Sequence, residues 1–325
     1  MKIGIDSFTI RELKLDPYGI IDFAQQHGFE GVQFDSLEEV SPELDERKLQ
    51  DVKQYGDARG IVTTMSINNC NPITAGVDEA VHRSVLEKQI RACASAGWHE
   101  LRSYIIASDE RYVHQLPWSE HVERSAAFIT SLRPVLESCG SRINLENHGD
   151  TTFELLAIVE QVGSDICGIC LDTANTLVNA EDPVMAAKRV APYIRMTHIK
   201  DAIISFTDRG VRRQGKAPGQ GNVDFATILP ILEAHNPELM LAIEDHKWLF
   251  DIPIFEEEWM RKNPDITALE LSSFAKLAVD TERRLAAGNL MQIEEYEAIP
   301  YREQMEERLT QGRDYIRSLI QGGAE

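Results

Sequence analysis

Four apolar, strand-like segments of this chain carry side chains that can bind a cation at or near their ends. INLE ends in Glu146 and CGICLD ends in Asp172, whereas IRMTHI carries His198 and LMLAIE ends in Glu244. A charge at the end of a buried strand is costly unless a cation or an ion partner meets it. Each residue taken singly has a structural explanation, such as an ion pair. Together, at four successive strands, they predict a divalent-metal site.

The types of these four side chains indicate which metal would bind. Three carboxylates and one imidazole suit Mn²⁺, which we expect first, with Mg²⁺ and Co²⁺ as alternatives. The lack of a thiol in the set argues against structural zinc.

Other polar residues lie close to this set in the sequence. His148 follows Glu146 by two residues, and on an extended segment that spacing returns both side chains to the same side. An imidazole there could act as a base near neutral pH. The sequence leaves equally open that His148 is a loop histidine that only orders the turn. Asn175 and Lys200, just after the sixth and seventh strands, are candidates to bind a substrate, and Lys200 could instead simply pair with a ligand carboxylate.

Further candidates for substrate binding are a cluster of arginines and a group of tryptophans. One of the clustered Arg209, Arg212 and Arg213 could reach the hydroxyls or a phosphate of a substrate, with Arg209 and Arg212 the residues we name first, although for any single arginine we favour a solvated loop charge. Trp118, Trp248 and Trp259 could line a sugar platform, and packing in the core or at its rim is the alternative.

A scaffold that gathers strand ends is needed to bring these residues together. Strand and helix signals alternate along the chain, which is typical of α/β proteins with a parallel sheet. Eight strands, each followed by a helical segment, fit a closed TIM (β/α)8 barrel, in which active sites lie at the carboxyl ends of the strands. A doubly wound open sheet would carry a Gly-rich turn after its first strand, and this chain has Ser7-Phe8-Thr9 there. The expected strands are 2–6, 31–35, 61–67, 100–106, 142–147, 167–172, 194–199 and 239–244.

The chain is longer than a barrel requires. We expect residues 1–250 to form the TIM barrel and residues 251–325 to form a C-terminal helical extension packed on it, with helices at 266–287 and 301–320. The Gly- and Arg-rich stretch at 208–224 is expected to be a long loop.

Composition narrows the class of protein. Of the 325 residues, 43% are hydrophobic, enough for a large core, and the formal net charge of −20 disfavours nucleic acid as a partner. The N-terminus lacks the features of a signal peptide, no run of about 18 apolar residues suggests a membrane span, and the five cysteines are scattered. A cytoplasmic protein without membrane contact is expected.

The motifs LENHGD, CLDTANTL, THIKDA and GQGNVD give a resemblance to the sugar phosphate isomerase/epimerase family of xylose isomerase-like TIM barrels, over roughly residues 1–248. The resemblance implies that Glu146, Asp172, His198 and Glu244 bind the metal. It also implies that the two glutamates act as acid and base on either side of a keto sugar, while the metal stabilises the enediolate charge. The family's epimerases often carry a histidine where this chain has Asn175, which can orient a hydroxyl but cannot exchange protons.

A subset of that family is also similar to this chain. His148, the C-terminal extension and the acidic surface resemble the catalytic subunits of bacterial C-glycoside deglycosidases. That resemblance implies that His148 removes a phenol proton, that the C–C bond of a 3-oxo-C-glycoside breaks by metal-assisted elimination, and that a small β-rich partner subunit is needed. An oligomer is also expected. A lesser alternative is a non-catalytic sugar-binding subunit, and a DNA-repair endonuclease would need more metal-binding histidines and a basic groove.

Overall fold

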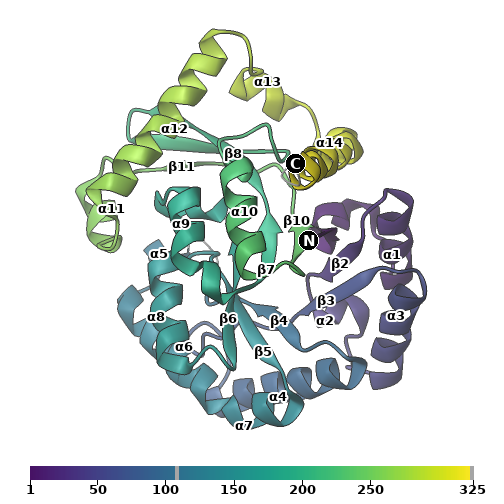
Figure 1. Cartoon of the computed structure of the whole chain (residues 1–325). Helices are drawn as coiled ribbons and strands as arrows, with labels where there is room; N and C mark the ends of the chain where they lie inside the picture. The colour runs from purple at the N-terminus through teal and green to yellow at the C-terminus, as the bar shows by residue number, and fades with distance from the viewer. Residues whose placement is uncertain (107–109, 323–325) are drawn as a thin grey trace.

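A closed barrel of eight parallel strands forms the centre of the molecule (Figure 1). The computed structural model describes residues 1–106 and 110–322. Around the barrel the strands follow the order β1-β10-β7-β6-β5-β4-β3-β2. The TIM barrel predicted from the alternation of strands and helices is therefore confirmed. Its strands are β1 (Lys2–Asp6), β2 (Gly31–Phe34), β3 (Val62–Ser66), β4 (Glu100–Ser103), β5 (Arg142–Glu146), β6 (Cys167–Asp172), β7 (Ile194–Ile199) and β10 (Met240–Ile243).

Helices surround the barrel, and local sequence signals define where they begin. Asp16 caps α1 by accepting a hydrogen bond from the Gly19 N–H at 2.8 Å, and Pro17 occupies the first helical position. Thr151 and Glu154 form a capping box at the start of α8. Buried side chains of helices and strands join in one hydrophobic core. The main outer helices are α1 (Pro17–Gln26), α3 (Glu46–Ala58), α4 (Glu79–Ala96), α6 (Trp118–Ser131), α7 (Arg133–Cys139), α8 (Thr152–Val162), α9 (Pro183–Val190) and α10 (Phe225–His235).

The register between neighbouring strands aligns their polar ends. Asp172 of β6 pairs with His198 of β7, and His198 in turn pairs with Ala242 of β10, two residues before Glu244. Because all three strands are parallel, these side chains lie at the same, carboxyl-terminal end of the barrel.

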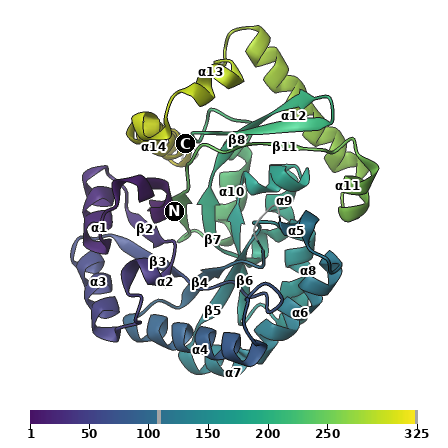
Figure 2. The ribbon, with the colours of Figure 1, turned by 180° about the vertical axis from the view of Figure 1, so that it is seen from behind.

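The segment after β7 is not the long loop expected at 208–224. It forms a hairpin of β8 (Asp201–Thr207) and β9 (Gly210–Lys216), and β11 (Leu249–Ile252) pairs with β9 to complete a three-stranded antiparallel sheet. Figures 1 and 2 show this sheet outside the barrel, on the side where α12 packs on β8.

The polar composition of β9 explains why the sequence did not predict a strand there. Arg213, Gln214 and Lys216 resemble solvated loop residues, yet all three are buried. Gln214 donates a hydrogen bond to the Ile293 carbonyl at 3.0 Å, so the C-terminal part of the chain supplies partners that no local pattern reveals.

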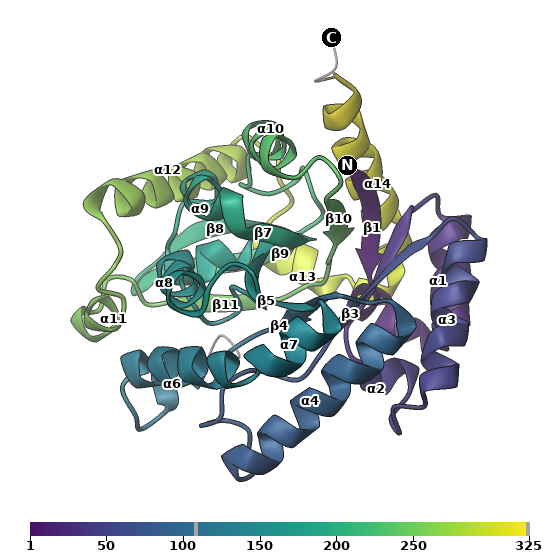
Figure 3. The same cartoon turned by 60° about the horizontal axis from the view of Figure 1, so that its bottom comes forward.

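The C-terminal helices lie against the barrel and the small sheet. Helix α14 packs beside β1, as Figure 3 shows. The Tyr301 hydroxyl donates to the Asp245 carbonyl at 2.6 Å and to the Thr9 carbonyl at 3.1 Å. These hydrogen bonds hold the start of α14 against Asp245, the residue after Glu244. None of the helices in the described part of the chain is long and apolar enough to cross a membrane. The C-terminal helices are α11 (Glu257–Lys262), α12 (Ala268–Ala286), α13 (Ile293–Ala298) and α14 (Tyr301–Gly322), and shorter elements are η1 (Ser7–Leu13), α2 (Leu37–Val40), α5 (Glu110–Val113), η2 (Asn175–Asn179) and η3 (Ala191–Tyr193).

Candidate metal centre

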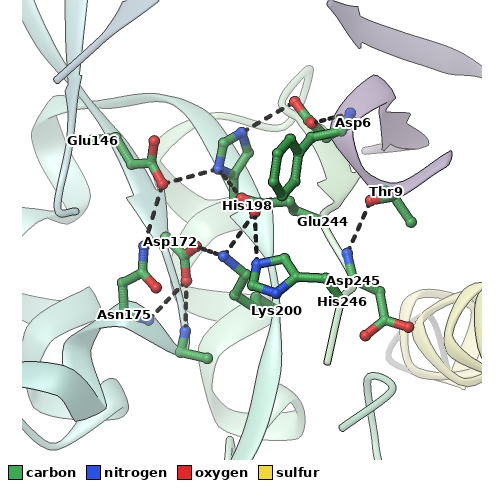
Figure 4. Close-up of polar contacts among 12 residues, drawn as sticks. Asp6, Thr9, Glu146, Asp172, Asn175, His198, Lys200, Glu244, Asp245 and His246 are labelled. Carbon is green, nitrogen blue, oxygen red and sulfur yellow. Dashed lines mark hydrogen bonds and ion pairs between the residues drawn. The ribbon is translucent and has the colours of Figure 1, made fainter. Parts of the chain in front are cut away.

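The structure brings together the four side chains that the sequence predicts as metal ligands. Glu146 is the last residue of β5 and Asp172 the last of β6, His198 lies within β7, and Glu244 follows β10 directly. One ligand atom from each residue lies within 4.8 Å of the others, and all four residues are buried. Figure 4 shows the side chains pointing toward one another from separate strands.

His198 lies between the two glutamates. Its Nδ1 is 2.7 Å from Glu244 Oε2 and 3.1 Å from Glu146 Oε1, so this nitrogen faces the other ligands. Its Nε2 points the opposite way, toward Asp6 Oδ2 at 3.5 Å and the Gln33 amide. Burial acts to lower the pKa of His198, but the surrounding carboxylates outweigh it and raise the pKa well above its ordinary value.

Two further cations, Lys200 and Arg102, balance the carboxylates. Lys200 Nζ lies 3.0 Å from Asp172 Oδ2 and 2.8 Å from Glu244 Oε1, and the Arg102 Nε donates to Glu146 Oε2 at 2.7 Å. Although burial acts to raise the pKa of Glu146, Arg102 and His198 hold it well below its usual range. Lys200 and His198 likewise keep the pKa of the buried Glu244 well below its usual value.

Hydrogen bonds from the strand ends orient Asp172. Its Oδ1 accepts from the backbone N–H groups of Ala174 at 2.9 Å and Asn175 at 2.8 Å, which directs Oδ2 toward Lys200. The Asn147 Oδ1 accepts a hydrogen bond from the Asp172 backbone N–H at 2.8 Å, and the Asn147 Nδ2 donates one to the Asp172 carbonyl at 2.9 Å. The end of β6 is thereby fixed against the end of β5.

This arrangement of donors fits a divalent cation. Three carboxylates crowd into a buried space, where their mutual repulsion is strong, and the positive charge of neighbouring side chains relieves part of it. A divalent cation bound by the same four residues would supply that positive charge instead. The set of three carboxylates and one imidazole suits Mn²⁺, Mg²⁺ or Co²⁺.

The other residues predicted near the metal also lie beside this group. Asn175 Nδ2 donates to Glu146 Oε1 at 3.3 Å, and Lys200 contacts two of the ligands as described. The His148 ring lies 5.6 Å from the Tyr104 ring, and burial lowers the His148 pKa. In the described part of the chain, His148 Nδ1 is buried and has no hydrogen-bond partner.

Three residues predicted to bind substrate contact side chains outside the metal centre. Arg209 has a 71% exposed side chain and pairs with Glu256, and Arg212 pairs with Asp251 of β11 at 2.6 Å. Trp118 opens α6 and stacks on His121 at 5.1 Å. These contacts give no support to the predicted substrate-binding role of the three residues.

Of the three arginines considered from the sequence, Arg213 is the one that is buried near the centre, and it donates to the Ala174 carbonyl at 3.4 Å. Sequence reasoning missed other residues of the centre. His246 Nε2 lies 3.2 Å from Glu244 Oε1. The sequence signal for such residues is a polar side chain inside or at the end of an apolar strand. The same signal would also have pointed to Asp6, Gln33 and Arg102 as residues around the centre.

Comparisons with known proteins agree with this fold. A sequence model for the family described as "Xylose isomerase-like TIM barrel" matches residues 21–269. The chain is 26% identical over 215 residues to the uncharacterized protein YihM of Escherichia coli (strain K12), an alignment that covers 66% of this chain and 61% of that protein. It is 27% identical over 188 residues to an L-ribulose 3-epimerase of Mesorhizobium japonicum, covering 53% of this chain and 58% of the epimerase. The matches thus span about three fifths of the length of these relatives.

Solved structures share the fold. D-psicose 3-epimerase from Clostridium cellulolyticum H10, crystallised with D-tagatose, has a TM-score of 0.62 at 17% identity, and the match covers 87% of this chain and 98% of that one. An L-ribulose 3-epimerase has a TM-score of 0.57 at 22% identity, covering 90% and 99% of the two chains. The IOLI protein with a binding zinc atom has a TM-score of 0.57 at 19% identity, covering 86% and 98%.

Proposed function

Because the chain belongs to the xylose isomerase-like TIM barrel family, we propose that it is a divalent-metal-dependent enzyme that moves a proton on the carbon next to the carbonyl of a keto sugar. The observation that carries the proposal is the convergence of four buried ligand atoms within 4.8 Å at the carboxyl ends of the barrel strands. Isomerisation or epimerisation is the chemistry that this arrangement supports best. Mn²⁺ is the metal we propose first, with Mg²⁺ and Co²⁺ as alternatives.

The two glutamates are proposed as the groups that exchange protons with the sugar. A divalent cation held by the four ligands would supply a Lewis acid for the carbonyl oxygen and make the adjacent C–H more acidic. Glu146 and Glu244 come from β5 and β10, which β6 and β7 separate in the barrel, so the carboxylates approach from different flanks. Arg102 and Lys200 keep both glutamates ionised and so able to accept a proton.

A second candidate function assigns the base to His148. Its buried Nδ1 lacks a hydrogen-bond partner within the described residues, which favours a nitrogen kept available for a substrate proton. Under this alternative the enzyme is a carbon–carbon lyase that cleaves 3-oxo-C-glycosides, His148 takes the phenol proton, and a small β-rich subunit assists. The non-catalytic sugar-binding alternative is weaker, because a simple binding subunit has no need of all four ligands and their charge partners.

We propose the same division of the chain as the sequence predicts, with residues 1–250 as the barrel and residues 251–325 as an extension packed on it. The contacts of Tyr301 with Thr9 and Asp245 support this division. Assembly into an oligomer also belongs to the proposal.

Metal content and isotope exchange test the main proposal. Purified protein should contain about one divalent ion per chain, and it should exchange deuterium from D₂O into a keto sugar such as D-tagatose, D-psicose or L-ribulose. Glu146→Gln and Glu244→Gln should each reduce exchange by about a hundredfold or more, as loss of a general acid or base does. Arg212→Gln is the matched control, because among the described residues its ion partners, Asp251 and Glu294, lie outside the centre. A metal-free protein with no exchange into any keto sugar would refute the proposal.

The lyase alternative has its own assay, in which 3-oxo-C-glycosides are the substrate, with and without a small partner protein from the same genome. His148→Ala should abolish cleavage there while leaving metal content unchanged. Cleavage that survives the substitution would show that His148 is not the base.

A further inference from the structure

We propose that Asp35 accepts a hydrogen bond from a hydroxyl group of the sugar and so determines which hydroxyl configurations the enzyme accepts. The inference rests on the proposed function, because the reacting end of the sugar is placed at the metal centre. Asp35 itself takes no part in holding the metal, and it lies on the other side of the barrel mouth.

The four candidate metal ligands come from one half of the barrel. They lie on β5, β6 and β7 and directly after β10, and these strands are consecutive in the closed sheet. Asp35 follows β2, which is four strands away from β6 in either direction around the barrel. Asp35 is therefore at the carboxyl end of the strand opposite the one that carries Asp172. A sugar whose carbonyl lies at the metal can extend its remaining hydroxyls over this second half.

Strand geometry directs the Asp35 side chain into the barrel mouth. Gln33, two residues earlier, is buried and donates from Nε2 to Asp6 Oδ2 at 3.2 Å inside the barrel. Because side chains two residues apart in an extended segment point to the same side, Asp35 lies above Gln33, nearer the mouth. Arg102 Nη1 donates to Asp35 Oδ1 at 3.1 Å, while its Nε donates to Glu146 Oε2 at 2.7 Å. One guanidinium therefore links Asp35 to a metal ligand.

Asp35 is more accessible than the metal ligands. Its side chain is 40% exposed, whereas the side chains of Glu146 and Glu244 are 0% and 9% exposed. In the described part of the chain, Asp35 Oδ1 has the Arg102 contact and Oδ2 has no hydrogen bond or ion pair. A free oxygen on a partly exposed carboxylate can accept a hydrogen bond from a sugar hydroxyl, and such a charge-assisted bond is about twice as strong as a neutral one.

Neighbouring groups hold Asp35 in place before a sugar binds. The Asp35 N–H donates to Ser7 Oγ at 2.9 Å, and Ser7 Oγ donates to Glu39 Oε2 at 2.6 Å. Ser7 is buried, so its hydroxyl is shielded from water. Together with the Arg102 contact, these bonds fix the backbone and one carboxylate oxygen of Asp35. A carboxylate that is already oriented loses little conformational freedom when it binds a hydroxyl.

Balancing the charge of Arg102 explains Asp35 less well. The Arg102 guanidinium already pairs with the buried Glu146 through both Nε and Nη2. The Asp35 contact uses one oxygen of a partly exposed carboxylate, and ion pairs of that kind contribute little to stability. A hydroxyl-binding role accounts for the free oxygen as well as for the position at the mouth.

Deoxy sugars test the inference through double-mutant cycles that pair the Asp35 side chain with single sugar hydroxyls. The probes are D-tagatose, D-psicose and L-ribulose, with derivatives that each lack one hydroxyl from C4 onward, titrated by calorimetry into Mn²⁺-loaded protein. In the wild type, loss of one of these hydroxyls should weaken binding by about tenfold or more. Asp35→Ala should bind the parent sugar about as weakly and show no further loss when the same hydroxyl is missing. Asp35→Asn keeps an acceptor oxygen without the charge, so it should retain part of the affinity.

Glu38→Ala is the matched control, because Glu38 is an exposed carboxylate three residues away on α2. It should leave every affinity unchanged. If Asp35→Ala only distorts the centre, it will weaken all sugars alike and each missing hydroxyl will still cost as much as in the wild type. That result overturns the inference, and so does failure of every sugar to bind.

Deuterium exchange separates this inference from the proposed function. If one hydroxyl is coupled to Asp35 but the wild type exchanges no deuterium into any of the sugars, Asp35 binds sugar as inferred and the proposed function is wrong. If the wild type exchanges deuterium and no hydroxyl is coupled to Asp35, the proposed function stands and the inference is wrong.

Discussion

Replacing Lys200 with methionine removes one positive charge from the candidate metal centre while nearly preserving the shape of the side chain. Lys200 Nζ contacts Asp172 Oδ2 at 3.0 Å and Glu244 Oε1 at 2.8 Å, and the residue is 4% exposed. In metal-free protein, Lys200→Met would therefore leave two buried carboxylates without their closest ammonium.

The size of this effect follows from the two distances. At an effective dielectric constant of about 20, each contact is worth about 6 kcal/mol of Coulomb energy. Burial of the ammonium offsets a large part of this sum, so the net loss of unfolding free energy should be about 3–5 kcal/mol, as is usual when one partner of a buried pair is removed. For a chain of this size, that loss lowers Tm by roughly 4–7 °C.

A bound metal should favour Lys200→Met over the wild type, the opposite of what is expected for metal-free protein. Lys200 competes with a cation for Asp172 and Glu244 and also repels it, so its loss should tighten Mn²⁺ binding by about tenfold or more, or about 1.4 kcal/mol. Because the stabilisation of the folded state by a bound ligand grows with the logarithm of its affinity, Mn²⁺ should raise the Tm of Lys200→Met more than that of the wild type.

Differential scanning calorimetry and Mn²⁺ titration, each with chelator-treated protein, measure both quantities. Lys247→Met is the matched control, because Lys247 donates to the Ile299 carbonyl at 2.7 Å and contacts none of the four ligands. It should lower Tm without changing Mn²⁺ affinity. If Lys200→Met binds Mn²⁺ no more tightly than the wild type and shows the same metal-induced rise in Tm, the assignment of these carboxylates as metal ligands would be wrong.

Two further predictions concern residues around the centre. Asn147→Ala removes the hydrogen-bond partners of the Asp172 backbone N–H and carbonyl. Urea unfolding should then show a loss of about 2–4 kcal/mol in the free energy of unfolding, and metal titration should show an affinity about 10–100-fold weaker. Unchanged metal affinity would refute a positioning role for Asn147. Glu181 and Glu270 share the guanidinium of Arg189, and burial raises the pKa of Glu181 to about 7 from 4.5. Because the unfolded chain releases the Glu181 proton at lower pH, the free energy of unfolding should fall by up to about 3 kcal/mol as pH rises from about 4.5 to about 7. Urea unfolding of Glu181→Gln should show a weaker dependence of stability on pH. The same pH dependence in both proteins would contradict this assignment.

Much of the centre could be predicted from the sequence because its ligands sit at the ends of strands. A strand is recognisable from a few consecutive apolar residues, and a carboxylate or imidazole at its end stands out against them. In a parallel barrel all such ends meet on one face, so Glu146, Asp172, His198 and Glu244 could be grouped without knowing any distance.

Other features depended on residues far apart in the chain. For Lys200 the sequence left open contact with substrate or pairing with a ligand carboxylate, and only the packed barrel shows that it lies between Asp172 and Glu244. Strand β9 was read as a loop because Arg213 and its polar neighbours are buried by helices that follow much later in the sequence.

The sequence by itself determined the alternation of strands and helices, the number of barrel strands and the identity of the residues at their ends, because hydrophobic periodicity and polar interruptions are local properties. The tertiary structure alone decided which charges neutralise one another, which arginine lies near the centre, and that Trp248 and Phe250 line one pocket with Tyr112 of a distant segment. Those outcomes depend on strand register and on contacts between distant segments, neither of which can be predicted from a local sequence pattern.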